Sequence, residues 1–340
     1  MIKIDMTGQK VRWGIAGLGK IAHRFTADLT QHVNNATLYA VAARDEQRAN
    51  AFAQHYQAAH AYSSYQAMAE DPNVDAVYIA TIHPFHKSMV DLFLKHRKHV
   101  LVEKPAFTNT QDWDDMKTLA DRQGLLLMEA MKSVTFPAYR ALRDFIQNNS
   151  IEIESVEAAF GNWHEFDIQQ QIFNPNLCGG ATLDVGVYAL WLYADLCQLK
   201  QSEIQPPSVT YQKHNTESKV DETVEFTFNH GIKGKIGASI SQDLKRVATI
   251  RGPEVEIVIQ DKWWNPTVID ITYKDEHTQI SHIPAGGGFE FEAAHLSQLI
   301  IDGKSSSDFV PHQTSRQVIA LMERSLKDNG FSHLLHASHQ

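Results

Sequence analysis

Residues 11–22, VRWGIAGLGKIA, decide the fold of this chain. The apolar run VRWGIAG (11–17) predicts a buried strand, and the amphipathic pattern that follows it predicts a helix. Between them lies a GxGxxA turn. Gly17 permits the tight turn, Gly19 lets a pyrophosphate approach the backbone, and the small Ala22 lets the helix pack on the strand. The stretch therefore predicts the first strand–helix unit of a dinucleotide-binding fold.

The start of this helix is the predicted phosphate site. A helix N-terminus offers amide donors and the positive end of a dipole to an anion. A glycine-rich turn alone is weak evidence, but this one follows a strand and opens a helix near the beginning of the chain. We therefore expect the cofactor to contact the whole run, which is Gly17, Leu18, Gly19, Lys20, Ile21 and Ala22.

Short apolar strands alternate with helical patterns as far as residue 130. Continuous apolar strands separated by helices are typical of a parallel sheet that is covered on both faces. This half is predicted to be a doubly wound α/β domain over residues 1–130. Its expected strands are 11–17, 36–43, 76–81, 99–104 and 124–130, and its expected helices are about 20–30, 45–57, 84–97 and 110–122.

From residue 131 the rhythm changes to alternating strands, which are typical of an antiparallel sheet with one covered face. We expect residues 131–340 to form an α+β domain with a large, mostly antiparallel open sheet. The few helices of this domain cannot cover both faces of the strands between 222 and 260, which also predicts a homodimer or higher oligomer. The expected strands are 153–161, 222–229, 234–241, 246–252 and 254–260, and the expected helices are 137–147, 179–195, 289–303 and 315–328.

Composition excludes several classes of partner. The 340 residues carry a formal charge of −9, which argues against nucleic-acid and anionic-membrane binding. Two cysteines, with no zinc-ligand spacing, predict neither a disulfide framework nor a metal site, and together with the lack of a signal-peptide pattern they favour the cytoplasm. The longest apolar helix contains Asp184 and Asp195, which a membrane span would avoid.

The second expected strand ends AVAARD, and its last residues bear on the choice of cofactor. Arg44 stands where an NAD site would place an acid, and a guanidinium suits the 2′-phosphate of NADP. NADP(H) is therefore favoured, with NAD(H) possible. Asp45 leaves two alternatives open, since it could cap the next helix or bind the ribose itself.

The strand at 76–81 ends ATIHPFHKS and places polar residues at the edge of the sheet where open α/β folds bind ligands. We expect Thr81, His83 and His86 to contact the cofactor. For His86, which lies at a helix start, a plain surface position is an equal alternative.

The stretch GGATLDVGVYALWLYAD (179–195) is an apolar helix with a carboxylate and a phenol on one face, because Asp184 and Tyr188 lie four residues apart. Taken alone, the pair is most simply a buried hydrogen bond. A second candidate lies in VLVEKPA, where Lys104 follows a buried strand and precedes a proline.

The motifs GIAGLGKIA, AVAARD, TIHPFHK, VLVEKPA, LMEAM and GGATLDVGVY occur in the order and spacing of the Gfo/Idh/MocA oxidoreductases. The chain resembles this family over nearly its whole length, and most resembles the branch of dimeric dihydrodiol dehydrogenases and NADP-dependent D-xylose dehydrogenases. The resemblance implies a small-molecule substrate, namely a sugar, polyol or cyclic diol, and a sheet that forms a dimer interface.

The resemblance also implies that Lys104 and the helix with Asp184 and Tyr188 meet at the nicotinamide. Tyr188 would then be the general acid/base, because a nearby cation lowers the pKa of a phenol from about 10. Lys104 would be that cation, and Asp184 would hold the substrate hydroxyl. Glu103 would support the loop or touch the nicotinamide ribose.

One departure from the branch concerns the substrate pocket. The branch continues its MEA motif with an aromatic residue and then an arginine, whereas this chain has MEAMKSVTFP, with Lys132 and Val134 in that region. This argues against assuming a dihydrodiol substrate. Lys132 could bind a substrate or form a surface salt bridge, and Trp163 and His164 could line the pocket or pack on the sheet.

Two other functions remain as alternatives. The chain could be a regulator that binds the cofactor without turnover, or an enzyme that uses a tightly held nucleotide in a redox-neutral reaction. The presence of Lys104, Asp184 and Tyr188 argues against the regulator.

Overall fold

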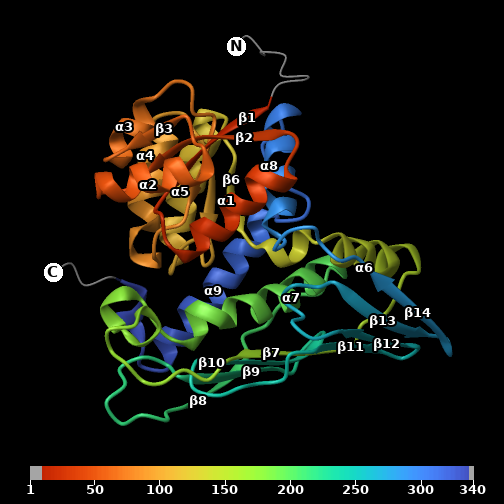
Figure 1. The fold of residues 1–340 in the computed structure, drawn as a ribbon. Helices are drawn as coiled ribbons and strands as arrows, with labels where there is room; N and C mark the ends of the chain where they lie inside the picture. Colours follow the sequence, from red (N-terminus) through yellow and green to blue (C-terminus); the bar gives the residue numbers. More distant parts are fainter. Residues whose placement is uncertain (1–9, 337–340) are drawn as a thin grey trace. The chain divides into compact units, whose positions relative to one another are not determined.

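The computed structural model describes residues 10–336, which divide into two compact units (Figure 1). The sequence predicted one boundary near residue 130, and the structure divides the chain differently because a late segment returns to the first unit. The first unit comprises the chain up to Phe107, Gln111–Thr135 and Pro284–His312, and the second comprises Thr108–Thr110, Phe136–Ile283 and the chain from Gln313 onward.

The first unit is built on a six-stranded parallel sheet in the order β3-β2-β1-β4-β5-β6. This is the strand order of doubly wound dinucleotide-binding folds, so the predicted Rossmann sheet is confirmed. The strands form from the apolar runs, and β4 and β6 are buried at every position. They are β1 (Val11–Ala16), β2 (Ala36–Ala42), β3 (His60–Tyr62), β4 (Ala76–Ile79), β5 (His99–Glu103) and β6 (Leu127–Ala130).

Helices connect these strands, as the alternating rhythm of the sequence predicts. Strand β3 and helix α3 were not predicted, since three and six residues are too short to show a period. The helices are α1 (Lys20–His32), α2 (Glu46–Tyr56), α3 (Tyr65–Glu70), α4 (His86–Lys95) and α5 (Thr110–Gln123), with 3₁₀ turns at His83–Phe85 and Lys132–Thr135.

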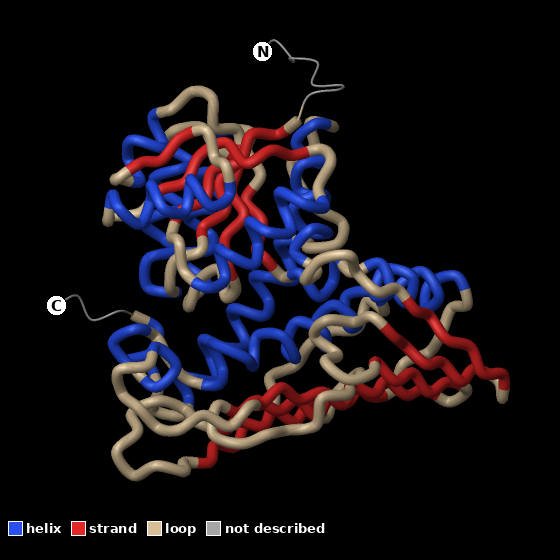
Figure 2. Tube along the Cα trace, in the orientation of Figure 1, coloured by secondary structure: helices blue, strands red, loops and turns tan. Residues whose placement is uncertain are grey.

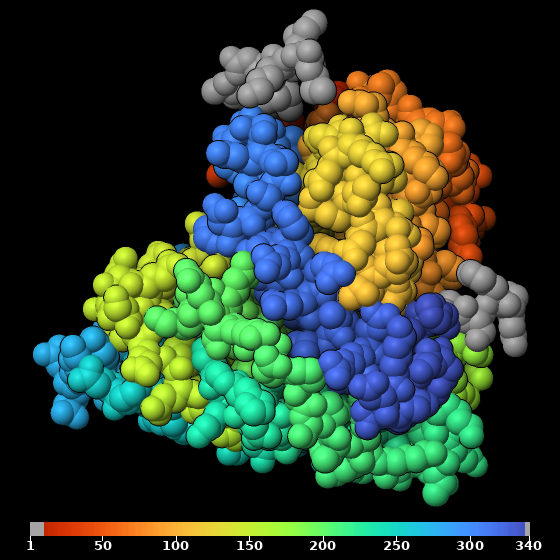
Figure 3. Space-filling model, turned by 180° about the vertical axis from the view of Figure 1, so that it is seen from behind, coloured from red at the N-terminus to blue at the C-terminus, as the bar shows by residue number. Residues whose placement is uncertain are grey.

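Helix α8 (Phe289–Ile301) belongs to the first unit although it comes late in the chain. The Trp13 indole on β1 donates a hydrogen bond to Ser297 Oγ at 3.0 Å. Asp28 on α1 accepts from the backbone amides of Gly287 and Phe289, at 2.7 and 3.0 Å. Figure 3 shows this blue segment directly beside the yellow residues of the same unit. These buried contacts explain why a boundary drawn from rhythm alone leaves the segment in the other half.

The second unit is built on an eight-stranded sheet in the order β14-β13-β12-β11-β7-β10-β9-β8. Only the β7–β10 pair is parallel, so the predicted mostly antiparallel sheet is confirmed. Strands β8, β13 and β14 were not predicted. The strands are β7 (Ser155–Gly161), β8 (Ser208–Gln212), β9 (Thr223–Phe228), β10 (Lys233–Ser239), β11 (Ala248–Gly252), β12 (Val255–Ile259), β13 (Val268–Tyr273) and β14 (Glu276–Ser281).

Helices cover one face of this sheet, as the red strands and blue helices of Figure 2 show. Helix α6 (Pro137–Asn148) packs on β13 and β14, and α7 (Val187–Leu199) packs on β7 and β10. Helix α9 (His312–Asp328) and short 3₁₀ turns complete the unit. Along β9 and β10, buried side chains such as Phe226 and Ile236 alternate with more exposed ones on the opposite face.

Helix α7 is the core helix of the second unit. The segment 175–199 has the length and hydropathy of a membrane span, but 83% of its most apolar window is buried inside the protein. Ten of its residues from Val187 to Cys197 are buried, including Asp195, whose carboxylate accepts from the Tyr139 hydroxyl at 2.8 Å. Burial within the unit therefore accounts for its apolar composition.

Candidate active site

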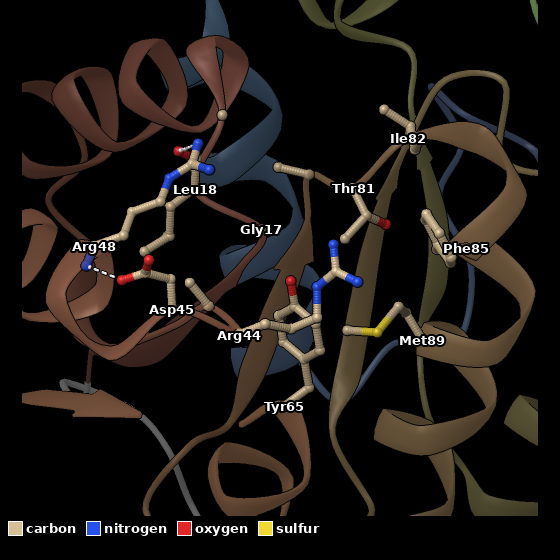
Figure 4. A pocket seen from close by; sticks show the side chains of 13 residues that line it. Gly17, Leu18, Arg44, Asp45, Arg48, Tyr65, Thr81, Ile82, Phe85 and Met89 are labelled. Atoms are coloured by element: carbon tan, nitrogen blue, oxygen red, sulfur yellow. Dashed lines mark hydrogen bonds between the residues drawn. The ribbon is translucent and has the colours of Figure 1, made fainter. Parts of the chain in front are cut away.

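The first unit contains a cavity of about 540 Å³ at the carboxyl ends of its parallel strands (Figure 4). It opens where β1 lies between β2 and β4, which is the point at which the strand order reverses and where such sheets bind ligands. The lining comes from the segments that follow these three strands. It consists of Gly17, Leu18, Gly19, Ala43, Arg44, Asp45, Arg48, Tyr65, Ala80, Thr81, Ile82, Phe85 and Met89.

The glycine turn forms one wall of the cavity. Gly17 has a φ of +88°, and a Cβ there would lie 3.0 Å from Thr81 Cγ2. Gly19 is the N-cap of α1 and makes no side-chain cap, and a Cβ there would meet nothing within 4 Å. The turn thus leaves open space in front of the first amides of α1, where the phosphates of a dinucleotide fit.

Three of the predicted turn residues form the helix start rather than the lining. Lys20 is exposed, Ile21 is half-buried and Ala22 is fully buried against the sheet. Ala22 therefore has the packing role that its small size predicts. Contact of Lys20 and Ile21 with the cofactor through their amides stays a prediction.

Two arginines and a tyrosine lie at the β2 side of the cavity. Arg44 is exposed and lines the cavity beside Tyr65 (Figure 4), and burial raises the pKa of Tyr65 while Arg44 and Arg48 oppose that rise. The Arg48 guanidinium donates to the backbone oxygen of Leu18 at 2.5 Å, which ties this side to the glycine turn. Sequence reasoning missed Arg48 and Tyr65, which lie in the first turns of α2 and α3.

Asp45 is the N-cap of α2. Its carboxylate accepts a hydrogen bond from the backbone amide of Arg48 at 2.9 Å, which satisfies one of the free donors at the helix start. Of the two alternatives that the sequence left open, the structure shows the helix cap. The cap occupies one carboxylate oxygen, and both Asp45 and Arg44 line the cavity.

The β4 side of the cavity carries Thr81, and His86 lies behind it. Thr81 lines the cavity, and its hydroxyl has no hydrogen-bond partner within residues 10–336. His86 is fully buried, with Nε2 2.9 Å from the Thr81 oxygen and Nδ1 3.0 Å from the Pro105 oxygen. His86 is therefore no surface residue. It joins the two loops that follow β4 and β5, while His83 is half-buried and lies outside the lining.

Lys104 directly follows β5 and precedes Pro105 through a cis peptide bond. The buried Glu103 accepts hydrogen bonds from the Lys104 amide at 3.1 Å and from the Tyr78 hydroxyl. Burial raises the pKa of Glu103, and Lys104 and Tyr78 oppose that rise. Glu103 thus supports the loop that carries Lys104, in agreement with one of its two predicted roles.

Lys132 is buried, with an exposed fraction of 6%, so it forms no surface salt bridge. Its ammonium donates to the Gly287 oxygen at 3.2 Å and lies 4.2 Å from the centre of the Phe289 ring. Burial and Arg24 lower the pKa of Lys132 to about 8, against the opposing effect of Glu292 and other carboxylates. The residue that departs from the family pattern is therefore a desolvated cation inside the first unit.

Asp184 and Tyr188 lie in the second unit. A π-helix, Thr182–Gly186, carries Asp184, and Tyr188 follows in the first turn of α7. Both are half-buried. Single π turns inside helices occur frequently at functional sites. Since Lys104 belongs to the first unit, the meeting of Lys104 with Asp184 and Tyr188 stays a prediction.

An aromatic pair lies on one side of Tyr188. The Phe160 ring on β7 lies 5.4 Å from the Tyr188 ring, and Trp264 stacks on Phe160 at 3.7 Å with an angle of 8°. Sequence reasoning missed both residues and named Trp163 and His164 instead. These two are exposed, and the Trp163 side chain has an exposed fraction of 62%.

Comparison with known proteins places these features in a family. A family model described as "Oxidoreductase family, NAD-binding Rossmann fold" matches residues 11–131. The trans-1,2-dihydrobenzene-1,2-diol dehydrogenase of Mus musculus is 33% identical over 334 residues, covering 94% of this chain and 97% of that protein.

Two solved structures show the same fold. KijD10, a 3-ketoreductase from Actinomadura kijaniata in complex with NADP and TDP-benzene, matches with a TM-score of 0.78 at 23% identity, covering 93% of this chain and 96% of that one. A levoglucosan dehydrogenase in complex with NADH and levoglucosan matches with a TM-score of 0.82 at 17% identity, covering 95% and 98%. By its sequence match along almost its full length, this chain belongs to the Gfo/Idh/MocA oxidoreductases.

Proposed function

We propose that the protein is an NADP-preferring dehydrogenase that transfers a hydride between the nicotinamide and the carbinol carbon of a sugar, polyol or cyclic diol. The observation that carries the proposal is the cavity at the carboxyl edge of the first sheet, with the open glycine turn at one wall and Arg44 at another. The relatives support the reaction class, since they are dehydrogenases of diols and sugars.

In this proposal the chain's own residues move the proton and bind the substrate. Bound NADP⁺ supplies the hydride acceptor. The Tyr188 phenolate takes the hydroxyl proton as the carbinol carbon becomes a carbonyl, and it returns a proton in the reverse direction. The Lys104 ammonium stabilises the phenolate and the developing charge on the substrate oxygen. Asp184 accepts a hydrogen bond from a second substrate hydroxyl.

The shape of the second unit near Tyr188 supports a ring-shaped substrate. The Phe160 ring, on which Trp264 stacks, lies 5.4 Å from the Tyr188 ring. The apolar face of a cyclic diol or a pyranose suits such aromatic surroundings, because aromatic side chains contribute large apolar area.

A spectroscopic screen tests the proposal. Aldoses, inositols and cyclic diols are offered with NADP⁺ or NAD⁺, and the absorbance of reduced nicotinamide is followed. We expect turnover with at least one compound, faster with NADP⁺. Cofactor binding without turnover of any compound supports the regulator instead, and nucleotide that stays bound through purification supports a redox-neutral reaction.

We also propose a homodimer or higher homo-oligomer that uses the outer face of the second sheet. This face is hollowed by a depression of about 350 Å³, and it carries charges of both signs. Glu157 and Glu225 alternate with Lys235 and Arg251, which suits a self-complementary interface. Light scattering checks this, and a mass of 38.4 kDa at micromolar concentration would contradict it.

The expected compartment is the cytoplasm. Cys178 and Cys197 are both buried free thiols, which suits a reducing environment. Fluorescence microscopy of a tagged chain in its host checks this expectation.

A further inference from the structure

A buried carboxylate holds the start of the helix that carries Asp184 and Tyr188. Asp221 lies just before β9 and has an exposed fraction of 1%. Its Oδ2 accepts from the Thr182 amide at 2.7 Å and from the Thr182 hydroxyl at 2.6 Å, and its backbone oxygen accepts from the Ala181 amide at 2.7 Å. Three hydrogen bonds thus join one residue to the first turn of the π-helix.

The other oxygen of the Asp221 carboxylate explains why residue 180 is a glycine. Gly180 has a φ of +113°, and a Cβ at this position would overlap Asp221 Oδ1. Within residues 10–336 this buried Oδ1 has no hydrogen-bond partner. The carboxylate therefore lies directly against the Gly180 backbone, which only a residue without a side chain permits.

Gly180 connects the contact to the functional residue. Its backbone oxygen accepts from the Asp184 amide at 3.1 Å, and its own amide donates to the Ile172 oxygen at 2.8 Å. A shift of the Gly180–Thr182 segment would therefore move the backbone of Asp184 and the turn that leads to Tyr188.

The arrangement is unfavourable for stability alone. Burial raises the pKa of Asp221 to about 7 although two hydrogen bonds from Thr182 oppose the rise, so the ionised form is poorly compensated. A neutral residue could accept the same bonds without that penalty. Unfavourable groups of this kind are typical of functional positions.

We propose that Asp221 is a positioning residue that fixes the π-helix, so that Asp184 and Tyr188 are held in the geometry that the reaction needs. This rests on the function proposed above. Helix placement matters for rate, since a displacement of about 1 Å can lower turnover by about 100-fold.

A matched pair of Thr182 variants tests the proposal in the full-length protein. Thr182→Val keeps the side-chain shape and removes the hydroxyl that donates to Asp221, whereas Thr182→Ser keeps it. We expect kcat/KM for the substrate found in the screen to fall by about tenfold in Thr182→Val and to recover in Thr182→Ser. The dissociation constant for NADPH should stay unchanged in both, because the cavity lies in the first unit. Thr272→Val, at an exposed position on β13, is the control.

Amide hydrogen exchange gives a second measurement that does not need a substrate. In Asp221→Ala, which removes the acceptor oxygens, we expect faster exchange of the amides from Ala181 to Val187, with the second half of α7 unchanged. Unchanged exchange in this segment would overturn the proposal, and so would loosened exchange with wild-type turnover in Thr182→Val. If the wild type turns over no compound, the proposed function fails, while the exchange data still decide whether Asp221 fixes the helix.

Discussion

The two units hold their functional residues by different means. In the first unit the residues stand on loops after parallel strands. The backbone positions them, through a glycine turn, a helix start and a helix cap. In the second unit they stand on a π-helix and on the first turn of α7, and a buried carboxylate from another part of the chain binds the start of the π-helix. A site made by sheet topology tolerates changes in single side chains, whereas a site held by one buried polar group should fail when that group changes.

The largest effect is expected from Tyr188→Phe. The change keeps the ring beside Phe160 and removes the transferable proton, so kcat should fall by about 10²–10⁴-fold. The dissociation constant for NADPH should stay at its wild-type value. Stopped-flow turnover and a fluorescence titration check both.

Lys104→Met provides the companion to this variant. It removes the charge, and residual activity should shift to higher pH as the phenol returns towards a pKa of about 10. The double variant should lose little more than the worse single variant, because residues that act as one unit are not additive. Near wild-type turnover in folded Tyr188→Phe would leave the helix with a packing role only.

A large effect on stability is expected at Asp221. Its folded pKa of about 7 lies above the ordinary value of 3.8, so the folded state binds the proton more tightly than the unfolded state. The wild type should therefore lose stability as pH rises from about 4 to about 7, by about 4 kcal/mol. Tyr211 on β8 also faces this group and stays protonated in that range, because burial and Asp221 raise its pKa.

Asp221→Asn should remove this pH dependence. Urea denaturation of both proteins at several pH values gives the difference between their free energies of unfolding, in which the contributions of other groups cancel. The difference should move in favour of the variant as pH rises. A difference that is independent of pH would show that folding does not raise the pKa of this carboxyl group.

A smaller and selective effect is expected at Arg44. Arg44→Ala should weaken NADPH binding by about 1–3 kcal/mol through the loss of a charge-assisted contact to the 2′-phosphate. NADH binding should hardly change. Fluorescence titration of both reduced cofactors checks this, and equal losses for the two would exclude the proposed contact.

The smallest effect is expected at Asp45. As a helix cap, Asp45→Ala should lower the free energy of unfolding of the first unit by about 1 kcal/mol. NADH affinity should be retained, since the residue that caps the helix does not hold the ribose. A strong loss of NADH affinity with unchanged stability would reverse this assignment.

The same contrast explains how much the sequence could predict. The glycine turn, Arg44 and Thr81 are readable because each follows a strand, and parallel topology brings such loops to one edge. Tyr65 and Arg48 escaped because one belongs to a helix of six residues and the other to the face of α2. Whether these side chains reach the cavity depends on how the two helices pack on the sheet, and no local sequence pattern predicts that packing.

In the second unit the local sequence predicts a helix with Asp184 and Tyr188 but not its π turn. The turn depends on Asp221, which lies 39 residues after Thr182, and no periodicity connects the two. Phe160 and Trp264 come together in the same way, from strand β7 and a distant loop. Lys132 stands out by its residue type, yet its burial becomes visible only when Phe289 and Gly287 return to the first unit.

The return of helix α8 has a consequence for the synthesis of the protein. When residues up to Thr135 have left the ribosome, all six strands of the first sheet have been synthesised. Trp13 then still lacks its acceptor Ser297, and Asp28 still lacks its donors at Gly287 and Phe289. The apolar face of α1 therefore stays exposed while roughly half of the chain is translated. Chaperones that bind exposed apolar surface would act in this interval. A truncated chain that ends at Thr135 carries the complete cofactor-binding turn and lacks the helix that packs on α1, so its solubility should depend on adding back residues 284–312 as a separate peptide.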